Sequence, residues 1–343
     1  MDGVTLDVAH LTKRYGARTA VDDLTFTASE GDVVGLLGPN GAGKTTTIRL
    51  LTTVLAPTSG EFSVAGHPWT APAEIRRRVG VLPESNGFPS HQTGEEYLRF
   101  HARLYGMSRE TARSEARSAL TAVGLEERAR SQISSYSRGM RQRLGIARAL
   151  VNHPAVVFLD EPTLGLDPAG QFQVLAIVRA IARTRGATVI LSTHTLPEVE
   201  EVCSRVLILA AGRVLTSGTV GEVIATAAVE RSARIRVPVE LVDRAVEGLA
   251  DLPDLQVERV EGQSGMLRVV SGGRSAPRPT GSSPSGSSPS GSSPVQGGHA
   301  EGNAVMNAAL TAVARVGVPV LSYELEGARL SDAFLKLTRT DAA

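Results

Sequence analysis

The residues with the clearest chemical meaning lie in the segment GPNGAGKTT, residues 38–46. Its spacing, G-x-x-x-x-G-K-T, is typical of a loop whose backbone N–H groups surround the phosphates of a nucleotide. Lys44 would reach the β- and γ-phosphates, and the Thr45 hydroxyl would be a ligand of Mg²⁺. The pattern could arise by chance, but an apolar run (33–37) precedes it and a helical pattern (46–54) follows it. We therefore predict a phosphate loop made of Gly38, Pro39, Asn40, Gly41, Ala42, Gly43, Lys44, Thr45 and Thr46.

Two acidic residues, Asp160 and Glu161, follow the near-continuous apolar run 155–159, which is typical of a buried parallel strand. Asp160 fits the carboxylate that holds Mg²⁺ in phosphate-loop NTPases, and Glu161 would activate the attacking water as general base. The alternative is a solvated pair of acids at a strand end. A second apolar run, 187–191, leads to His194. If both runs are neighbouring parallel strands, His194 would lie close to these acids at the same sheet edge. The alternative is that His194 has only a structural role.

Ser137 begins a third informative segment, because a serine ahead of an apolar helical face is a typical N-cap. Gly139 follows in the first turn, where glycine destabilises a helix by about 1 kcal/mol relative to alanine. Close approach of another group to the backbone would explain this glycine. The apolar face of the predicted helix consists of Leu144, Ile146, Ala147 and Leu150.

Tyr15 lies in a turn between two segments, 4–9 and 21–28, that alternate as half-buried antiparallel strands do. An aromatic side chain ahead of a phosphate loop could stack on an adenine ring, or it could only pack against the turn. The residues alone leave both possibilities open.

Thr93 and Glu96 have the spacing of a capping box at the start of a helix. The pattern stays helical over 93–123, which predicts a helical insertion in an otherwise α/β domain. Three large apolar residues follow the cap at helical spacing: Tyr97, Phe100 and Leu104.

The composition excludes several classes of protein. A length of 343 residues predicts about two domains, and the net charge of +1 gives no electrostatic signature of nucleic-acid binding. The single cysteine, Cys203, excludes an intrachain disulfide, and we expect it to pack within a helix. No run of about eighteen apolar residues occurs, so we expect no transmembrane helix, and charged residues in the N-terminal region argue against a targeting segment.

Taken together, these motifs resemble one family. Residues 1 to about 220 look like the ATP-binding subunit of an ABC transporter, with YSRGM (136–140) in place of the family's signature LSGGQ and LGLD (164–167) in place of its D-loop. The resemblance implies ATP and Mg²⁺ as cofactors and His194 as the switch histidine. It further implies that Tyr15 stacks on adenine and that Ser137, Gly139 and Asp167 contact the nucleotide.

The resemblance also implies a mechanism and partners. Two copies of such a domain dimerise head to tail, so that ATP lies between the phosphate loop of one and the signature helix of the other. We expect hydrolysis to drive a separate transmembrane permease, with this chain held peripherally at the cytoplasmic side of the membrane. No nucleic-acid partner is expected.

The chain departs from the family pattern at two places. Glu84 stands where the family usually has glutamine, and we predict that its carboxylate enters the site as a further ligand of Mg²⁺. Gln92, eight residues later, is the other candidate for that position. In the signature, Arg138 replaces a glycine and Met140 the glutamine. The YSRGM form resembles the ATPases of ABC-2-type exporters, including drug-resistance and sodium-extrusion systems, and this favours export.

The C-terminal part, 221–343, predicts a small α+β domain with the order βαββαβ, which is the ferredoxin-like order. A Gly/Ser/Pro-rich repeat, 279–298, lies inside this domain, and we expect disorder over about 272–300. The closing segment LSDAFLKLT is amphipathic. We expect a regulatory or dimer-supporting role for the domain.

The sequence thus predicts a phosphate-loop NTPase (RecA-like) α/β core over 1–220, with an antiparallel β subdomain and a helical insertion at about 86–150, followed by the α+β domain. The main alternative function is an ABC-type ATPase that acts on a ribosome or nucleic-acid complex without transport. A catalytically silent binding module is a third class, against which intact Lys44, Asp160 and Glu161 argue.

Overall fold

The computed structural model describes residues 3–85, 87–227, 232–250, 252, 255–260, 262–271, 307–326 and 329–340. The chain divides into two compact units, Met1–Val223 (unit 1) and Ile224–Ala343 (unit 2). Each unit is described by itself.

Unit 1 is organised around a six-stranded sheet. In spatial order its strands are β10 (Arg213–Thr219), β9 (Arg205–Ala210), β3 (Val33–Leu37), β8 (Thr188–Thr193), β7 (Val156–Asp160) and β6 (Val79–Leu82). The five strands from β9 to β6 are parallel, and β10 is antiparallel to β9. The C-terminal ends of β3, β6, β7 and β8 therefore meet at one edge of the sheet.

A second, antiparallel sheet has the order β2 (Arg18–Ser29), β1 (Val4–Tyr15), β4 (Ser59–Val64) and β5 (His67–Pro68). The predicted antiparallel pair 4–9 and 21–28 is confirmed, and both strands are longer than predicted because β1 and β2 stay paired as far as Tyr15 and Arg18.

The central strands separate two hydrophobic cores, because successive side chains of a strand point to opposite faces. In β7, Val157 and Leu159 belong to a core shared with the helices α5 (Arg138–Leu150) and α6 (Pro168–Arg185). Val156 and Phe158 belong to the other core, shared with α1 (Lys44–Leu51), α2 (Pro72–Arg78) and the antiparallel sheet. Burial on both faces holds the sheet edge in place, since each buried large apolar side chain contributes roughly 1.5–3 kcal/mol.

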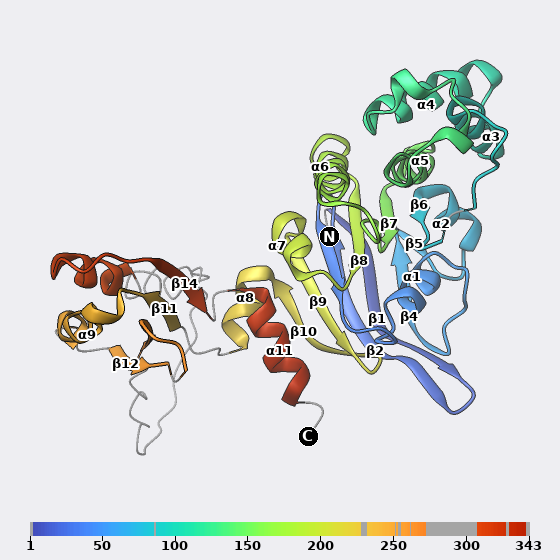
Figure 1. Ribbon diagram of the computed structural model, residues 1–343. Helices are drawn as coiled ribbons and strands as arrows, with labels where there is room; N and C mark the ends of the chain where they lie inside the picture. The colour runs from blue at the N-terminus through green and yellow to red at the C-terminus, as the bar shows by residue number, and fades with distance from the viewer. Residues whose placement is uncertain are drawn as a thin grey trace, which may run out of the picture. The chain divides into compact units, whose positions relative to one another are not determined.

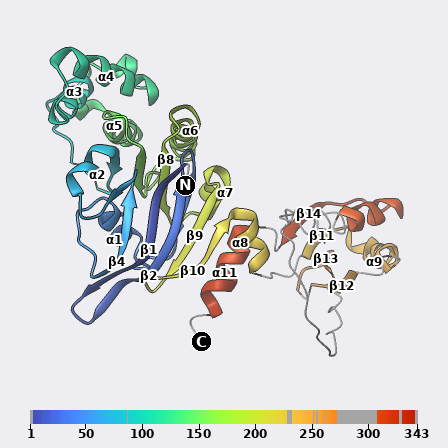
Figure 2. The same cartoon turned by 180° about the vertical axis from the view of Figure 1, so that it is seen from behind.

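The helical insertion contains α3 (Gly94–Leu104), α4 (Arg109–Ala122), two 3₁₀ turns (Glu126–Arg128 and Ile133–Ser135) and α5. The capping box is confirmed: Thr93 Oγ1 accepts from the Glu96 N–H at 3.2 Å, and Glu96 Oε2 accepts from the Thr93 N–H at 2.9 Å. In both Figure 1 and Figure 2 these helices gather at one end of unit 1, away from the turn of the β1–β2 hairpin.

The helical pattern over 93–123 corresponds to two helices, α3 and α4, with a turn between them. The chain leaves the helix after Leu104, and Ser108 caps a new helix by accepting from the Thr111 N–H at 3.0 Å. Of the three apolar residues at helical spacing, only Tyr97 is buried, whereas Phe100 is 55% and Leu104 is 66% exposed.

Unit 2 contains β11 (Ser232–Arg236), α9 (Val242–Ala250), β12 (Leu255–Arg259), β13 (Met266–Ser271), a helix over 307–315 and β14 (Ser322–Glu326). The sheet order is β12-β13-β11-β14 and every pair is antiparallel. β11 and β12 are therefore parallel to each other with β13 between them, and β13 and β14 are parallel with β11 between them. Two interlocked split βαβ units of this kind confirm the predicted ferredoxin-like order.

The core of unit 2 lies between its sheet and two of its helices, α9 and the helix over 307–315, and includes Ile235, Leu249, Val269 and Val313. The closing amphipathic segment forms α11 (Leu330–Thr340). The expected disordered repeat, 279–298, lies outside the described residues.

Candidate functional site

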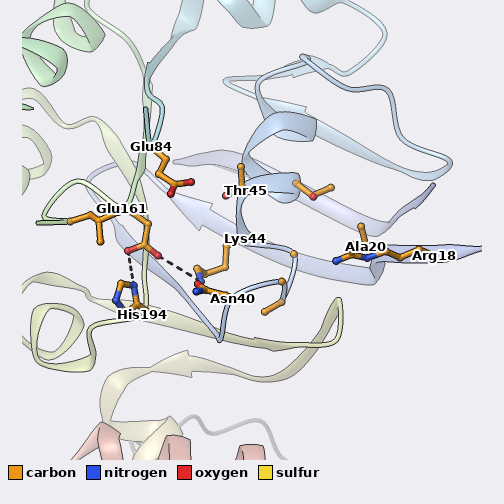
Figure 3. Close-up of a pocket in the computed structure, with 13 residues that line it drawn as sticks. Arg18, Ala20, Asn40, Lys44, Thr45, Glu84, Glu161 and His194 are labelled. Atoms are coloured by element: carbon orange, nitrogen blue, oxygen red, sulfur yellow. Dashed lines mark hydrogen bonds and ion pairs between the residues drawn. The ribbon is translucent and has the colours of Figure 1, made fainter. Parts of the chain in front are cut away.

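A pocket of about 490 Å³ opens at the edge where the ends of β3, β6, β7 and β8 meet. It brings together residues that are far apart in the sequence (Figure 3). The lining residues are Arg18, Ala20, Asn40, Gly41, Ala42, Gly43, Lys44, Thr45, Thr46, Glu84, Glu161, Leu164 and His194.

The phosphate loop occupies one wall of this pocket and runs directly into α1. Gly43 is the N-cap of α1 with φ of 107°, and a Cβ at this position would lie 2.5 Å from the Ala20 carbonyl oxygen. Only glycine fits there, which explains the second glycine of the predicted motif. The N-terminus of α1 points its free N–H groups and positive dipole end towards the pocket, as anion binding requires.

Lys44 lies in the pocket wall and is only 7% exposed. Its Nζ donates to the carbonyl oxygen of Gly38 at 2.7 Å and to that of Pro39 at 3.4 Å. The same Nζ lies 3.7 Å from Glu161 Oε1. The lysine is thus held at the pocket wall beside Glu161, and its contact with the β- and γ-phosphates stays a prediction.

Glu161 forms the opposite wall and is tightly oriented. Its Oε2 lies 2.9 Å from His194 Nδ1, and its backbone N–H donates to the Ser192 carbonyl at 3.0 Å. Its φ of 49° is unusual for a residue other than glycine, and such strain is found at functional sites. A carboxylate held by histidine and facing a pocket can act as a general base towards water.

Asp160 lies directly before Glu161 at the end of β7 and is 3% exposed. One of its carboxylate oxygens accepts a hydrogen bond from the Ser192 hydroxyl. The Asp160 carboxylate and the Thr45 hydroxyl offer the hard oxygen atoms that Mg²⁺ prefers, and Mg²⁺ usually binds through one or two carboxylates together with substrate phosphates. These residues therefore fit the ion that the sequence predicts.

Of the two candidates for the family's glutamine position, only Glu84 lines the pocket. Figure 3 shows its carboxylate directed into the same space that Thr45 and Lys44 face. Gln92 lies outside the pocket lining, between Pro89, whose carbonyl accepts from the Gln92 N–H, and Ile133, which donates to the Gln92 carbonyl. The Gln92 side-chain oxygen is buried and accepts no hydrogen bond from the described part of the chain.

Outside the phosphate loop, four predicted nucleotide contacts do not line this pocket, and neither do Gly38 and Pro39 at the start of the loop or the predicted metal ligand Asp160. Tyr15 is at the end of β1, 46% exposed, with Lys13 Nζ 5.3 Å from the centre of its ring. Ser137 caps α5 by accepting from the Met140 N–H at 3.2 Å, and Asp167 caps α6 by accepting from the Gly170 N–H at 3.2 Å. The predicted N-cap at Ser137 is confirmed, while the contacts of these residues with nucleotide stay predictions.

Gly139, the fourth of them, lies at the second position of α5. Apart from Gly139 itself, its two chain neighbours and the backbone of its own helix, no described atom lies within 4 Å of the place that a Cβ at Gly139 would take. The fold of a single chain therefore gives no steric reason for this glycine.

Sequence reasoning missed Glu198, which lies behind the site and is 4% exposed. Its Oε2 accepts from the hydroxyl of Thr163 at 2.7 Å and from that of Thr193 at 3.1 Å. Burial raises the pKa of the Glu198 carboxyl and the charge of Glu161 raises it further, while the two hydroxyl bonds oppose this. The available signal is helical spacing, since Glu198 shares a face of α7 (Leu196–Val202) with the buried Val202.

Cys203 follows α7 directly and takes no part in the pocket lining. Burial raises the pKa of its thiol to about 12. This agrees with the predicted packing role, because a thiol that stays protonated is a poor nucleophile.

The profile of the ABC transporter family matches residues 21–164. The chain is 40% identical over 206 residues to the bacitracin transport ATP-binding protein BcrA of Bacillus licheniformis, covering 60% of this chain and 66% of that protein. It is 40% identical over 220 residues to the daunorubicin resistance ATP-binding protein DrrA3 of Streptomyces coeruleorubidus, covering 64% and 69%. The chain thus spans about two thirds of the length of these relatives.

Among solved structures, this chain is matched by the dimeric structure of a post-hydrolysis state of the ATP-binding cassette MJ0796 bound to ADP and Pi. The TM-score is 0.57 at 25% identity, covering 62% of this chain and 98% of that one. No helix in the part of the chain that the structure describes is long and apolar enough to cross a membrane.

Proposed function

This chain belongs to the ABC transporter family as one of its ATP-binding proteins, and from that premise we propose that it hydrolyses ATP to energise export through a separate membrane-spanning partner. One observation carries the proposal: Lys44, Glu161 and His194, which follow three different strands in the sequence, line one pocket, and Glu161 contacts both of the others. The relatives named for bacitracin transport and daunorubicin resistance support export as the direction.

In the proposed reaction Glu161 accepts a proton from the attacking water, and His194 keeps the carboxylate oriented towards the γ-phosphate. Lys44 stabilises the negative charge that develops on the transferred phosphoryl group. Thr45 and Asp160 would hold Mg²⁺, which neutralises phosphate charge when bound. Glu84 would add a third oxygen ligand from the end of β6.

We further propose that the active state is a head-to-tail dimer of this chain. Ser137 and Gly139, at the N-terminus of α5, would face the γ-phosphate held by the phosphate loop of the partner copy, and Asp167 would contact the same nucleotide. Tyr15 would stack on the adenine. The open N–H groups and positive dipole end of α5 support this assignment, as does the dimeric cassette with ADP and Pi.

The proposed dimer binds a separate permease and is thereby held at the cytoplasmic side of the membrane. ATP-dependent closure and opening of the two copies would move the permease. Bacitracin and daunorubicin belong to the names of those relatives, and for this chain we propose export without naming a substrate.

The proposal is tested by Glu161→Gln, which keeps the shape of the side chain and removes the general base. We expect ATP turnover to fall by about 10²–10⁴-fold and the protein to accumulate as an ATP-bound dimer. Phosphate release and light scattering after size-exclusion chromatography measure the two effects, with the exposed Glu110→Gln as control. Turnover that persists in Glu161→Gln locates the base elsewhere. Copurification with ribosomes instead of a membrane protein would overturn the transport proposal.

A further inference from the structure

Arg138, which stands where the family signature has a glycine, contacts another loop of its own chain. It is the first residue of α5, and its Nη2 donates to the carbonyl oxygen of Leu164 at 2.9 Å. Leu164 lies 26 residues further along, in the loop that joins β7 to α6. A hydrogen bond from a guanidinium to a carbonyl is charge-assisted and stronger than one between neutral groups.

The loop has a shape that receives this guanidinium. Gly165 has φ of 70°, in the left-handed region that favours glycine. A Cβ at Gly165 would lie 2.3 Å from Nη2, 2.4 Å from Cζ and 2.7 Å from Nη1 of Arg138. A side chain at this position would therefore push the guanidinium away from the Leu164 carbonyl.

The same loop leads back to the reacting groups. The Leu164 N–H donates to the Glu161 carbonyl at 3.2 Å, and Leu164 itself lines the pocket. On its buried side, the loop is held by the bond from Thr163 to Glu198. Arg138 holds it on the exposed side, so two side chains from outside the loop fix its position next to Glu161.

We propose that Arg138 is a positioning residue, whose bond to the Leu164 carbonyl fixes the loop 162–166 and joins the N-terminus of α5 to the catalytic Glu161 of the same chain. The inference rests on the proposed function, because α5 begins at the surface that would meet the partner's nucleotide. Under this proposal, the N-terminus of α5 acts in cis, on the active site of its own chain. An arginine that reached across to the partner's phosphates would act in trans.

Mixed dimers separate the two cases. One full-length chain carries Glu161→Gln, so that only the Glu161 of the other, differently tagged chain turns over ATP. Arg138→Ala is placed either on the chain with the intact Glu161 or on the Glu161→Gln chain. In the first arrangement we expect kcat to fall about fivefold, the loss of one hydrogen bond, with KM for ATP unchanged. In the second we expect no change.

A loss confined to the second arrangement, an equal loss in both, or no loss in either would each overturn the positioning role. Amide hydrogen exchange of the single chain gives a readout that needs no dimer. Exchange at residues 164–166 should accelerate in Arg138→Ala and stay unchanged in Arg141→Ala, which removes an exposed arginine from the same helix. Unchanged exchange in Arg138→Ala also overturns the proposal. If no dimer forms with ATP but amide exchange is accelerated in Arg138→Ala, the result contradicts the proposed function and leaves the positioning role of Arg138 intact.

Discussion

Two surfaces of unit 1 would meet nucleotide, and they differ in how far the chain itself fixes their polar groups. At the sheet edge, Lys44, Asp160 and Glu198 are each buried and bonded to groups of the same chain. At the N-terminus of α5, Ser137 is exposed and Gly139 has space around it. The first residues of any helix leave N–H groups without partners in the helix.

The polar groups of the two surfaces are therefore positioned in different ways. Folding of one chain places Glu161 against His194 and Lys44, because strands packed on both faces cannot shift independently. The α5 surface has its cap and its contact to Leu164, and its remaining donors suit a ligand brought by another molecule. Substitutions at the two surfaces should therefore have different effects. At the α5 surface turnover should fall without a loss of stability, whereas at the sheet edge turnover and stability should fall together.

Gly139→Ala is the variant with the largest expected effect on this comparison. Because no neighbour in the described chain fills the Cβ position, alanine should raise the free energy of unfolding by up to about 1 kcal/mol through helix propensity. If a partner's phosphate approaches this backbone, turnover should fall by roughly 30-fold, about 2 kcal/mol of lost transition-state binding. Thermal unfolding and phosphate release measure the two quantities.

The control for that variant is Gly145, in the same helix but buried. Gly145→Ala adds the same methyl group away from the proposed nucleotide surface. We expect it to change stability and to leave ATP-dependent dimerisation of the folded protein unaffected. A Gly139→Ala protein that is more stable and fully active would remove the α5 N-terminus from the site.

Glu198→Leu tests the sheet edge and should have the next largest effect. It leaves the hydroxyls of Thr163 and Thr193 without their acceptor, so the free energy of unfolding should fall by roughly 1–3 kcal/mol. The loop after Glu161 loses its buried support, and we expect kcat to fall about tenfold. Chemical denaturation and steady-state kinetics on the same preparation give both numbers.

Glu198→Gln is the matched variant, since its amide oxygen still accepts from the two hydroxyls. Burial raises the pKa of Glu198 above the ordinary 4.5, so the folded wild type binds more protons than the unfolded chain just above that pH. Wild-type stability is therefore partly lost as pH rises towards the raised value, and the glutamine should abolish this loss. Identical pH profiles of stability for the two proteins would contradict the assignment.

The features of unit 1 and unit 2 that the sequence predicts share a physical basis. The positions of the phosphate loop, Glu84, Glu161 and His194 could be inferred because each follows an apolar run that is recognisable as a strand, and parallel strands bring their C-terminal ends together. The order βαββαβ followed from the same kind of local pattern. Glu198 was missed because its nearer hydrogen-bond partner, the Thr163 hydroxyl, lies 35 residues earlier in the chain and reaches it only through the tertiary fold.

The break between α3 and α4 was missed for a related reason. The helical spacing of apolar residues continues through Phe100 and Leu104, although both are exposed and the chain turns at residues 105–108. The bond from Arg138 to Leu164 has no signature in spacing at all, because it joins the start of one helix to a distant loop. Pattern reasoning therefore locates elements and strand ends, while cross-links between loops need coordinates.

Glu84→Gln has the smallest expected effect and sharpens the comparison at the sheet edge itself. Glu84 is an exposed carboxylate that lines the pocket, unlike the buried and bonded Asp160. Replacing it with the family's usual glutamine removes one negative charge, so ATP binding should persist while the Mg²⁺ concentration that gives half-maximal turnover shifts about threefold, less than 1 kcal/mol. Titration of turnover with Mg²⁺ measures the shift, and Glu110→Gln, an exposed acid remote from the pocket lining, should show none. If neither the Mg²⁺ requirement nor ATP binding differs from wild type, Glu84 is not a ligand, and the metal is held by Thr45, Asp160 and phosphate oxygens without it.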